Sequence, residues 1–261
     1  MLGGCKKIVL KIGSNVLSND EGVMDRESVR NIADQVCRLR RRDKQVIIVS
    51  SGAGICGAGA IKKWDRREDI NYKQALCAIG QVELMIAYRE YMGRHGVHVA
   101  QMLLTAEDFR ENIRNLNIRN TLFTLVDEGV VPVINENDSV SVDEIKIGDN
   151  DMLAAYTAVL WNADLLALMS DVDGVYDKSP KLHEDAKLIP EVYGAADLLE
   201  NIDSGGKSQF GTGGMVTKIS AAEEANRYGI PVVLANGKKP DILRRLETGD
   251  ENGTVFFRRG A

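Results

Sequence analysis

Short apolar runs recur along the chain, and longer stretches with helical periodicity separate them. The short runs are rich in β-branched residues, which predicts buried strands; they are Lys7–Ile12, Gln45–Ser50, Val97–Leu103, Val130–Ile134, Asp164–Met169 and Ile230–Ala235. The longer stretches predict helices over Asp25–Arg41, Tyr72–Arg94, Arg110–Glu128, Asp149–Trp161 and Met215–Tyr228. This alternation predicts an α/β fold in which helices cover both faces of a mainly parallel central sheet.

The predicted helix Tyr72–Arg94 carries apolar residues at spacings of three and four, which is typical of a face that packs against a core. These residues are Leu76, Ile79, Val82, Leu84, Met85 and Tyr88. The same helix is also a candidate interface in an oligomer.

Composition narrows the class of protein. The chain has 261 residues, 44% of them apolar, and a formal net charge of −5. The absence of a general positive field excludes a broad nucleic-acid or anionic-membrane binder. Four cysteines without metal or redox spacing, and no apolar run of membrane-spanning length, predict a cytoplasmic protein with no nucleic-acid and no membrane partner.

In a parallel sheet, ligands bind beyond the carboxyl ends of the strands, so the residues that follow each strand are the candidates for chemistry. Lys11 ends the first strand, ahead of small residues that leave room for a phosphate; a lysine reaching solvent at an edge is the alternative. Ser51 and Gly52 begin a glycine-rich stretch whose backbone amides suit an anion.

Two glycine motifs fail when their context is considered. Gly52, Gly54 and Gly57 match GxGxxG, but the residues that follow are too polar for the strand that a dinucleotide fold requires. A dinucleotide oxidoreductase therefore ranks third among the alternatives. The Gly206-Lys207-Ser208 sequence lacks the first glycine of a P-loop, since position 201 is Asn201.

The densest polar sequence lies in the middle of the chain, at residues 135–138 and 148–151. Its amides and carboxylates suit an ammonium group or a metal held on phosphates, and a pair of capped turns is the alternative. Ser170 and Asp171 follow another strand, and a second glycine-rich stretch leads to Lys218. Two anion sites with two lysines favour phosphoryl transfer over hydride transfer or hydrolysis, and three histidines argue against zinc or a histidine base.

Taken together, these motifs resemble the amino acid kinase family over nearly the whole chain. The resemblance is carried by VLKIGSNVL, VSSGAG, KQALCAIGQVELM, GVVPVINENDSV, KIGDNDMLAA, MSDVDGVYD and GTGGMVTK, in this order. It implies a three-layer α/β/α sandwich with ATP and an amino acid over the carboxyl edge of the sheet. The implied reaction is ATP-dependent phosphorylation of the γ-carboxylate of L-glutamate, the first step of proline biosynthesis.

The resemblance also implies roles for particular residues. Lys11 and Lys218 would stabilise the transferring phosphoryl group, and Asp151 would orient both lysines. The implied substrate-binding residues are Ser51, Gly52, Asp138, Asp149 and Asn150. The implied nucleotide-binding residues are Lys11, Ser170, Asp171, Thr212, Gly213, Gly214, Met215, Val216, Thr217 and Lys218. Mg²⁺ would be held by the ATP phosphates, without a protein metal ligand.

We expect one amino acid kinase domain over residues 1–261, with an amino-acid lobe near 1–163, a nucleotide lobe near 164–261, and no PUA domain. Two departures from the family pattern, Ile147 before GDND and the SGAGICGAG variant, predict altered packing or affinity with activity retained. The family further suggests a homo-oligomer, a dimer or tetramer, and feedback inhibition by L-proline. Two alternatives remain open: a sister kinase acting on aspartate or N-acetylglutamate, and a non-catalytic amino-acid sensor.

Overall fold

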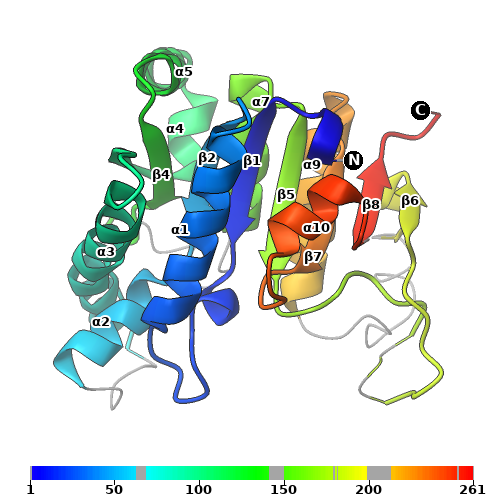
Figure 1. The fold of residues 1–261 in the computed structure, drawn as a ribbon, viewed down its shortest axis with the longest axis horizontal. Coiled ribbons are helices and arrows are strands. Elements are labelled where there is room, and N and C mark those ends of the chain that lie inside the picture. Colours follow the sequence, from blue (N-terminus) through cyan, green and yellow to red (C-terminus); the bar gives the residue numbers. More distant parts are fainter. Residues whose placement is uncertain are drawn as a thin grey trace.

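An eight-stranded sheet forms the centre of the molecule, in the order β3-β4-β2-β1-β5-β7-β8-β6 (Figure 1). The computed structural model describes residues 2–62, 69–140, 150–178, 180, 182–198, 213–251 and 253–260. The strands are β1 (Lys7–Ile12), β2 (Gln45–Ser50), β3 (Val99–Leu104), β4 (Val131–Glu136), β5 (Leu165–Ser170), β6 (Glu191–Tyr193), β7 (Val232–Asn236) and β8 (Thr254–Phe257). Neighbouring strands are parallel except for β7 and β8, which confirms the predicted mainly parallel sheet.

Helices cover both faces of this sheet, so the predicted three-layer α/β/α architecture is confirmed (Figure 1). One layer holds α1 (Arg26–Arg40), α2 (Ala53–Ile61), α3 (Ile70–Gly93) and α10 (Ile242–Thr248), with the 3-10 turns η1 (Leu2–Gly4) and η2 (Ser14–Val16). The other holds α4 (Ala106–Arg110), α5 (Asn112–Asp127), α7 (Asn150–Trp161) and α9 (Gly213–Arg227). None of the described helices combines the length and the apolar character needed to cross a membrane.

The strands predicted from β-branched runs agree closely with the structure. One strand, β4, extends further than predicted, and its added residues belong to the candidate site. β4 continues to Glu136, so Asn135 and Glu136 belong to the strand itself. The elements that the pattern did not predict are β6, β8, α2, α4 and α10. These are short, and α2 is rich in glycine, which has low helix propensity.

The predicted apolar face of α3 was partly wrong. Ile79 and Val82 are 39% and 58% exposed, whereas Gly80 and Gln81 face inward. The cause is close contact with α2: a Cβ on Gly80 would lie 1.8 Å from the Ala53 carbonyl oxygen. Because Gly80 must face α2, α3 is rotated about its own axis relative to the predicted orientation. Part of its apolar stripe is therefore exposed.

Candidate active site

A buried cluster of charged side chains lies at the carboxyl end of β1. The Lys11 ammonium is 2.6 Å from Asp151 Oδ1, and the Lys218 ammonium is 3.1 Å from Asp151 Oδ2. The side chains of Lys11, Asp151 and Lys218 are 5%, 2% and 14% exposed. Three residues that are far apart in the sequence, from β1, α7 and α9, therefore meet at one point.

Strand alternation explains how Lys11 reaches this cluster. Ile12 and Leu10 pack in the layer of α1 and α3, whereas Val9 packs under α7 and α9, so Lys11 points toward these two helices. Lys7 lies on the same side of β1 and donates a 2.6 Å hydrogen bond to the Trp161 carbonyl. The helix α7 thus lies antiparallel along β1, with its first turn at Lys11 and its last at Lys7.

The electrostatics of the cluster centre on Asp151. Burial by itself raises the pKa of this carboxyl, but the charges of Lys11 and Lys218 outweigh burial and hold the pKa below its ordinary value of 3.8. Two cations against one anion leave one positive charge in excess among these three side chains. A buried excess of positive charge is suited to a phosphoryl group.

The start of α9 fixes the position of Lys218. Thr217 donates a 2.9 Å hydrogen bond to Asp151 Oδ2, and the Lys218 ammonium donates a 3.0 Å hydrogen bond to the Gly214 carbonyl. The Thr217 contact joins α9 to the first turn of α7, and the Gly214 contact holds the Lys218 side chain along its own helix. The free amides at the start of a helix also favour a bound anion.

A neutral hydrogen-bond cluster lies beside the charged one. The Asn150 amide nitrogen donates to Ser51 Oγ at 2.9 Å and to Asn135 Oδ1 at 2.8 Å. The backbone N–H of Glu136 donates to Asn135 Oδ1 at 2.9 Å and to Asn150 Oδ1 at 3.2 Å. Because Asn150 and Asp151 are consecutive, the first turn of α7 joins the neutral cluster to the charged one.

The start of α2 and Asp138 border the neutral cluster. Gly52 caps α2 at φ 110°, a conformation that favours glycine. Asp138 lies in the turn after β4, against α3: burial, the Asp138 charge and a hydrogen bond to Asp138 raise the pKa of the Cys77 thiol well above its ordinary range. Asp138 thus places a carboxylate in the turn after β4, next to Cys77 of α3, and a carboxylate is a suitable partner for an ammonium group.

The predicted nucleotide-binding residues at the end of β5 form a second polar edge. Asn15 donates a 2.9 Å hydrogen bond to Asp171 Oδ2, and Ser170 donates to Asp171 Oδ1 at 3.2 Å. Burial raises the pKa of Asp171, but the hydrogen bonds from Asn15, from the Asp171 backbone and from Ser170, with the charge of Lys218, outweigh burial and lower the pKa overall. Ser170, Gly214, Met215, Val216 and Thr217 all lie on the carboxyl side of the sheet, at the end of β5 or the start of α9.

Some of the predicted residues cannot be placed, and others were missed. Asp149 and Thr212 lie outside the described residues. Asn135 was noted only as part of a polar cluster, and Asn15 and Gln81 were not singled out. The signal for Gln81 was present in the sequence, as a polar side chain within the apolar stripe of a long helix.

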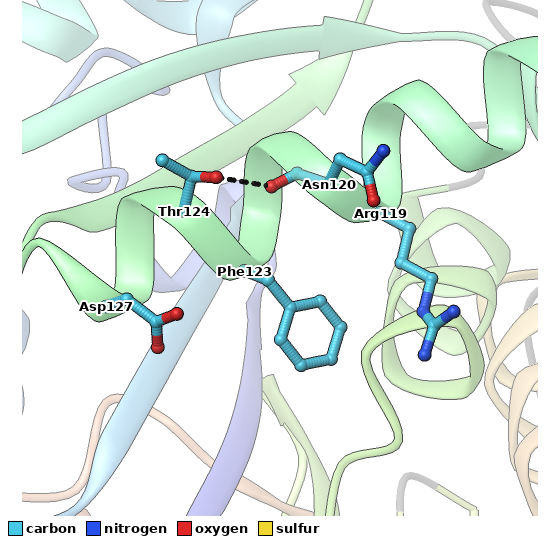
Figure 2. A pocket seen from close by; sticks show the side chains of 5 residues that line it. All are labelled: Arg119, Asn120, Phe123, Thr124 and Asp127. Atoms are coloured by element: carbon cyan, nitrogen blue, oxygen red, sulfur yellow. Dashed lines mark hydrogen bonds between the residues drawn. The ribbon is translucent and has the colours of Figure 1, made fainter.

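A separate hollow lies along α5, lined by Arg119, Asn120, Phe123, Thr124 and Asp127 (Figure 2). The Phe123 ring lies 5.1 Å from the Lys7 ammonium, and Lys7 is at the amino end of β1. This hollow is therefore at the opposite end of the strand from Lys11 and is distinct from the candidate active site.

Comparison with known proteins identifies the class. Residues 6–236 match the model of the amino acid kinase family. The chain belongs to this family, whose fold and site layout were expected from the sequence motifs.

Relatives at high identity are more specific. The chain is 58% identical to a protein named glutamate 5-kinase from Alkaliphilus oremlandii, covering 97% of this chain and 96% of the relative. It is 59% identical to a glutamate 5-kinase from Alkaliphilus metalliredigens, covering 98% and 97%. A glutamate 5-kinase from Trichlorobacter lovleyi is 44% identical, and the match covers 98% of this chain but 68% of that protein.

Solved structures that resemble this one share its fold at low identity. A UMP kinase from Bacillus anthracis superimposes with a TM-score of 0.67 at 18% identity, covering 97% of this chain and 96% of that one. An isopentenyl phosphate kinase gives 0.65 at 20% identity, covering 95% and 99%. These similarities concern the fold alone.

Proposed function

We propose that this protein is a glutamate 5-kinase, which transfers the γ-phosphoryl group of ATP to the γ-carboxylate of L-glutamate. The observation that carries the proposal is the Lys11–Asp151–Lys218 cluster, joined through α7 to the Ser51–Asn150–Asn135 cluster. Identity of up to 59% to proteins named glutamate 5-kinase supports the same substrate. The product is L-glutamyl 5-phosphate, which places the reaction at the start of proline biosynthesis.

The chemistry requires little from a general base. A carboxylate is already ionised at neutral pH, so one of its oxygens attacks the γ-phosphorus directly while the bond to the β,γ-bridging oxygen breaks and ADP leaves with that electron pair. The obstacle is repulsion between two anions. Lys11 and Lys218 offset this repulsion and stabilise the charge of the transferring group, and Asp151 keeps the two ammonium groups in place.

The neutral cluster suits the amino acid. Ser51 and Asn150 provide hydrogen-bonding groups for the carboxylates of glutamate, and we assign Gly52 and Asp149 to the same substrate on the family resemblance. Asp138 binds its ammonium group. We assign the nucleotide to Ser170, Asp171 and the sequence segment from Thr212 to Lys218, as the family resemblance implies. Mg²⁺ bound to the phosphates supplies further positive charge; the lysines and amides of this site fit phosphate oxygens better than they fit a metal ion.

The remaining features follow from the same assignment. We assign the chain to one amino acid kinase domain, with an amino-acid lobe near 1–163 and a nucleotide lobe near 164–261, acting in the cytoplasm. A dimer or tetramer is consistent with the exposed Val82 and Ile79 on α3. L-Proline is the proposed feedback inhibitor, at or overlapping the glutamate site.

The test is ADP release from Mg-ATP with and without L-glutamate, with hydroxylamine present to trap the acyl phosphate. We expect glutamate-dependent ADP release with a matching amount of hydroxamate. L-Aspartate and N-acetyl-L-glutamate are the parallel substrates. Turnover with either of these but not with glutamate would overturn the substrate assignment, and ATP binding without turnover on any of them would favour the sensor.

A further inference from the structure

A buried side chain that lies outside the proposed substrate contacts reaches the neutral cluster from α3. The Asn135 amide nitrogen donates a 2.8 Å hydrogen bond to Gln81 Oε1, and both residues are buried, at 2% and 7% exposure. Asn135 uses its oxygen for Asn150 and for the backbone of Glu136. Gln81, Asn135, Asn150 and Ser51 therefore form one continuous series of hydrogen bonds.

This series crosses the carboxyl edge of the sheet from one helical layer to the other. Val131 and Val133 pack in the α1 and α3 layer, so strand alternation directs Asn135 to the same side as Gln81. Asn150 begins α7, which lies in the opposite layer. A hydrogen bond made by α3 thus acts, through Asn135, on the first turn of α7.

The amide nitrogen of Gln81 argues against a purely structural role. Its Nε2 is buried and has no hydrogen-bond partner within the part of the chain that the structure describes. A buried donor without a partner is destabilising, and an apolar side chain of similar length would avoid that cost. What glutamine contributes and an apolar residue does not is an acceptor for Asn135.

The same face of α3 makes a second polar contact with a neighbouring strand end. Tyr88 lies two turns after Gln81, and its hydroxyl is 3.0 Å from Ser50 Oγ, at the end of β2. The position of α3 is itself set by the close contact of Gly80 with α2. One rigid helix face therefore holds the ends of β2 and β4, which carry Ser51 and Asn135.

We propose that Gln81 is a positioning residue for the amino-acid substrate, which holds Asn135 so that Asn135 in turn orients Asn150. This inference rests on the proposed function, since Asn150 is a proposed glutamate contact. Gln81 itself does not touch the substrate. Its loss weakens substrate binding without removing a group that stabilises the transferring phosphoryl group.

The test compares Gln81→Met, which removes the acceptor at similar length, with Leu84→Met as a packing control on the same buried helix face. We expect Gln81→Met to raise the KM for glutamate by about 3- to 10-fold, as expected for one neutral hydrogen bond. The kcat and the KM for ATP should stay within about 2-fold, and Leu84→Met should change neither KM. The melting temperature of Gln81→Met should stay near that of the native protein, because one unpaired buried donor replaces another.

Gln81→Glu is the conservative variant, since either protonation state of its carboxyl offers Asn135 an acceptor. Its KM should lie closer to the native value than that of Gln81→Met. An unchanged glutamate KM in Gln81→Met would overturn the proposal, as would equal losses in both KM values together with a lower melting temperature.

A crystal structure of Gln81→Met separates this proposal from the proposed function. If the native protein shows no glutamate turnover, the function falls, but the structure still reports on Asn135. We expect the Asn135 side chain to lose its hydrogen bond to Asn150. An unmoved Asn135–Asn150 pair would overturn the positioning role whatever the substrate proves to be.

Discussion

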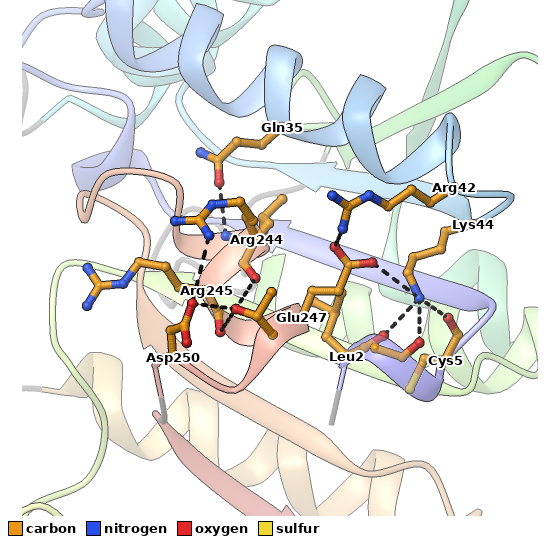
Figure 3. Close-up of polar contacts among 12 residues, drawn as sticks. Leu2, Cys5, Gln35, Arg42, Lys44, Arg244, Arg245, Glu247 and Asp250 are labelled. Carbon is orange, nitrogen blue, oxygen red and sulfur yellow. Dashed lines mark hydrogen bonds and ion pairs between the residues drawn. The ribbon is translucent and has the colours of Figure 1, made fainter.

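Two lysines are buried at opposite ends of the parallel strands, and each lies near one carboxylate that also binds a second cation. At the carboxyl end, Lys11 and Lys218 share Asp151. At the amino end, Lys44 lies 3.9 Å from Glu247, which also pairs with Arg42 (Figure 3). The two clusters hold the same charges, yet their surroundings differ.

The difference lies in what else binds the ammonium group. Lys44 donates to the carbonyl oxygens of Leu2, Gly3 and Cys5 at 3.0, 2.9 and 2.7 Å, which occupies its three N–H groups (Figure 3). Lys44 thus holds η1 against β2 and α10. Lys218 instead lies at the start of α9, beside amides that favour an anion. The same charges therefore hold backbone carbonyl groups in one cluster and are suited to binding phosphate in the other.

The largest expected effect is on turnover when a lysine of the Asp151 cluster is removed. Lys218→Ala or Lys11→Ala should lower kcat by about 10²- to 10³-fold, as for loss of one electrostatic donor to a transition state. Lys218→Ala is the cleaner variant, because the Lys218 side chain is 14% exposed against 5% for Lys11, so its removal disturbs the buried packing less. The measurement is hydroxamate formation, with thermal melting as the control for folding. A folded variant with near-normal kcat would refute the role of that lysine.

Lys44→Met should lower the stability of the protein and leave turnover unchanged, the opposite of the lysine variants in the Asp151 cluster. Three carbonyl oxygens lose their donor, one of them in a buried place and two in partly buried places, so the free energy of unfolding should fall by about 3 kcal/mol. The kcat of the folded enzyme should stay unchanged, because the cluster lies at the far end of the strands. Urea denaturation and the hydroxamate assay measure the two effects. A large drop in kcat without a loss of stability would contradict the contrast between the two lysines.

Acid should weaken the Asp151 cluster in a predictable direction. The pKa of Asp151 is lower in the folded protein than its ordinary value of 3.8, so its contribution to stability is present above that value and is lost as the pH falls through the folded pKa. Asp151→Asn should be less stable than the native protein at neutral pH. The gap should narrow below about pH 4, where the carboxyl of the unfolded chain begins to protonate while that of the folded protein is still ionised. Urea denaturation across this range measures it, and a gap independent of pH would count against the assignment.

The parts of the site that could be predicted from the sequence are those that depend on motifs at strand ends, and the parts that could not depend on how helices pack or on backbone partners. Strand-end reasoning pointed to Lys11, Lys218 and the polar segment 148–151, because the topology of a parallel sheet brings these places together. The pairing of Asp151 with the two lysines was implied by the family resemblance. Gln81 was missed because its role depends on the rotation of α3, which Gly80 sets through contact with α2. The Lys44 cluster was missed as well, since its partners are backbone carbonyls, which any sequence could supply.

The smallest expected effect concerns the second cation of each cluster, Arg42 at the amino end and Lys218 at the carboxyl end. Arg42 and Lys218 each pair with a carboxylate that already has a buried lysine nearby, but the Arg42 side chain is 56% exposed against 14% for Lys218. Solvent screens an exposed pair, so Arg42→Ala should lower the free energy of unfolding by less than about 1 kcal/mol and leave kcat unchanged. Urea denaturation of Arg42→Ala is compared with that of Lys44→Met, and the kcat of Arg42→Ala is compared with that of Lys218→Ala. If Arg42→Ala destabilised the protein as much as Lys44→Met, then Glu247 rather than the carbonyl oxygens would be the main partner of the amino-end cluster.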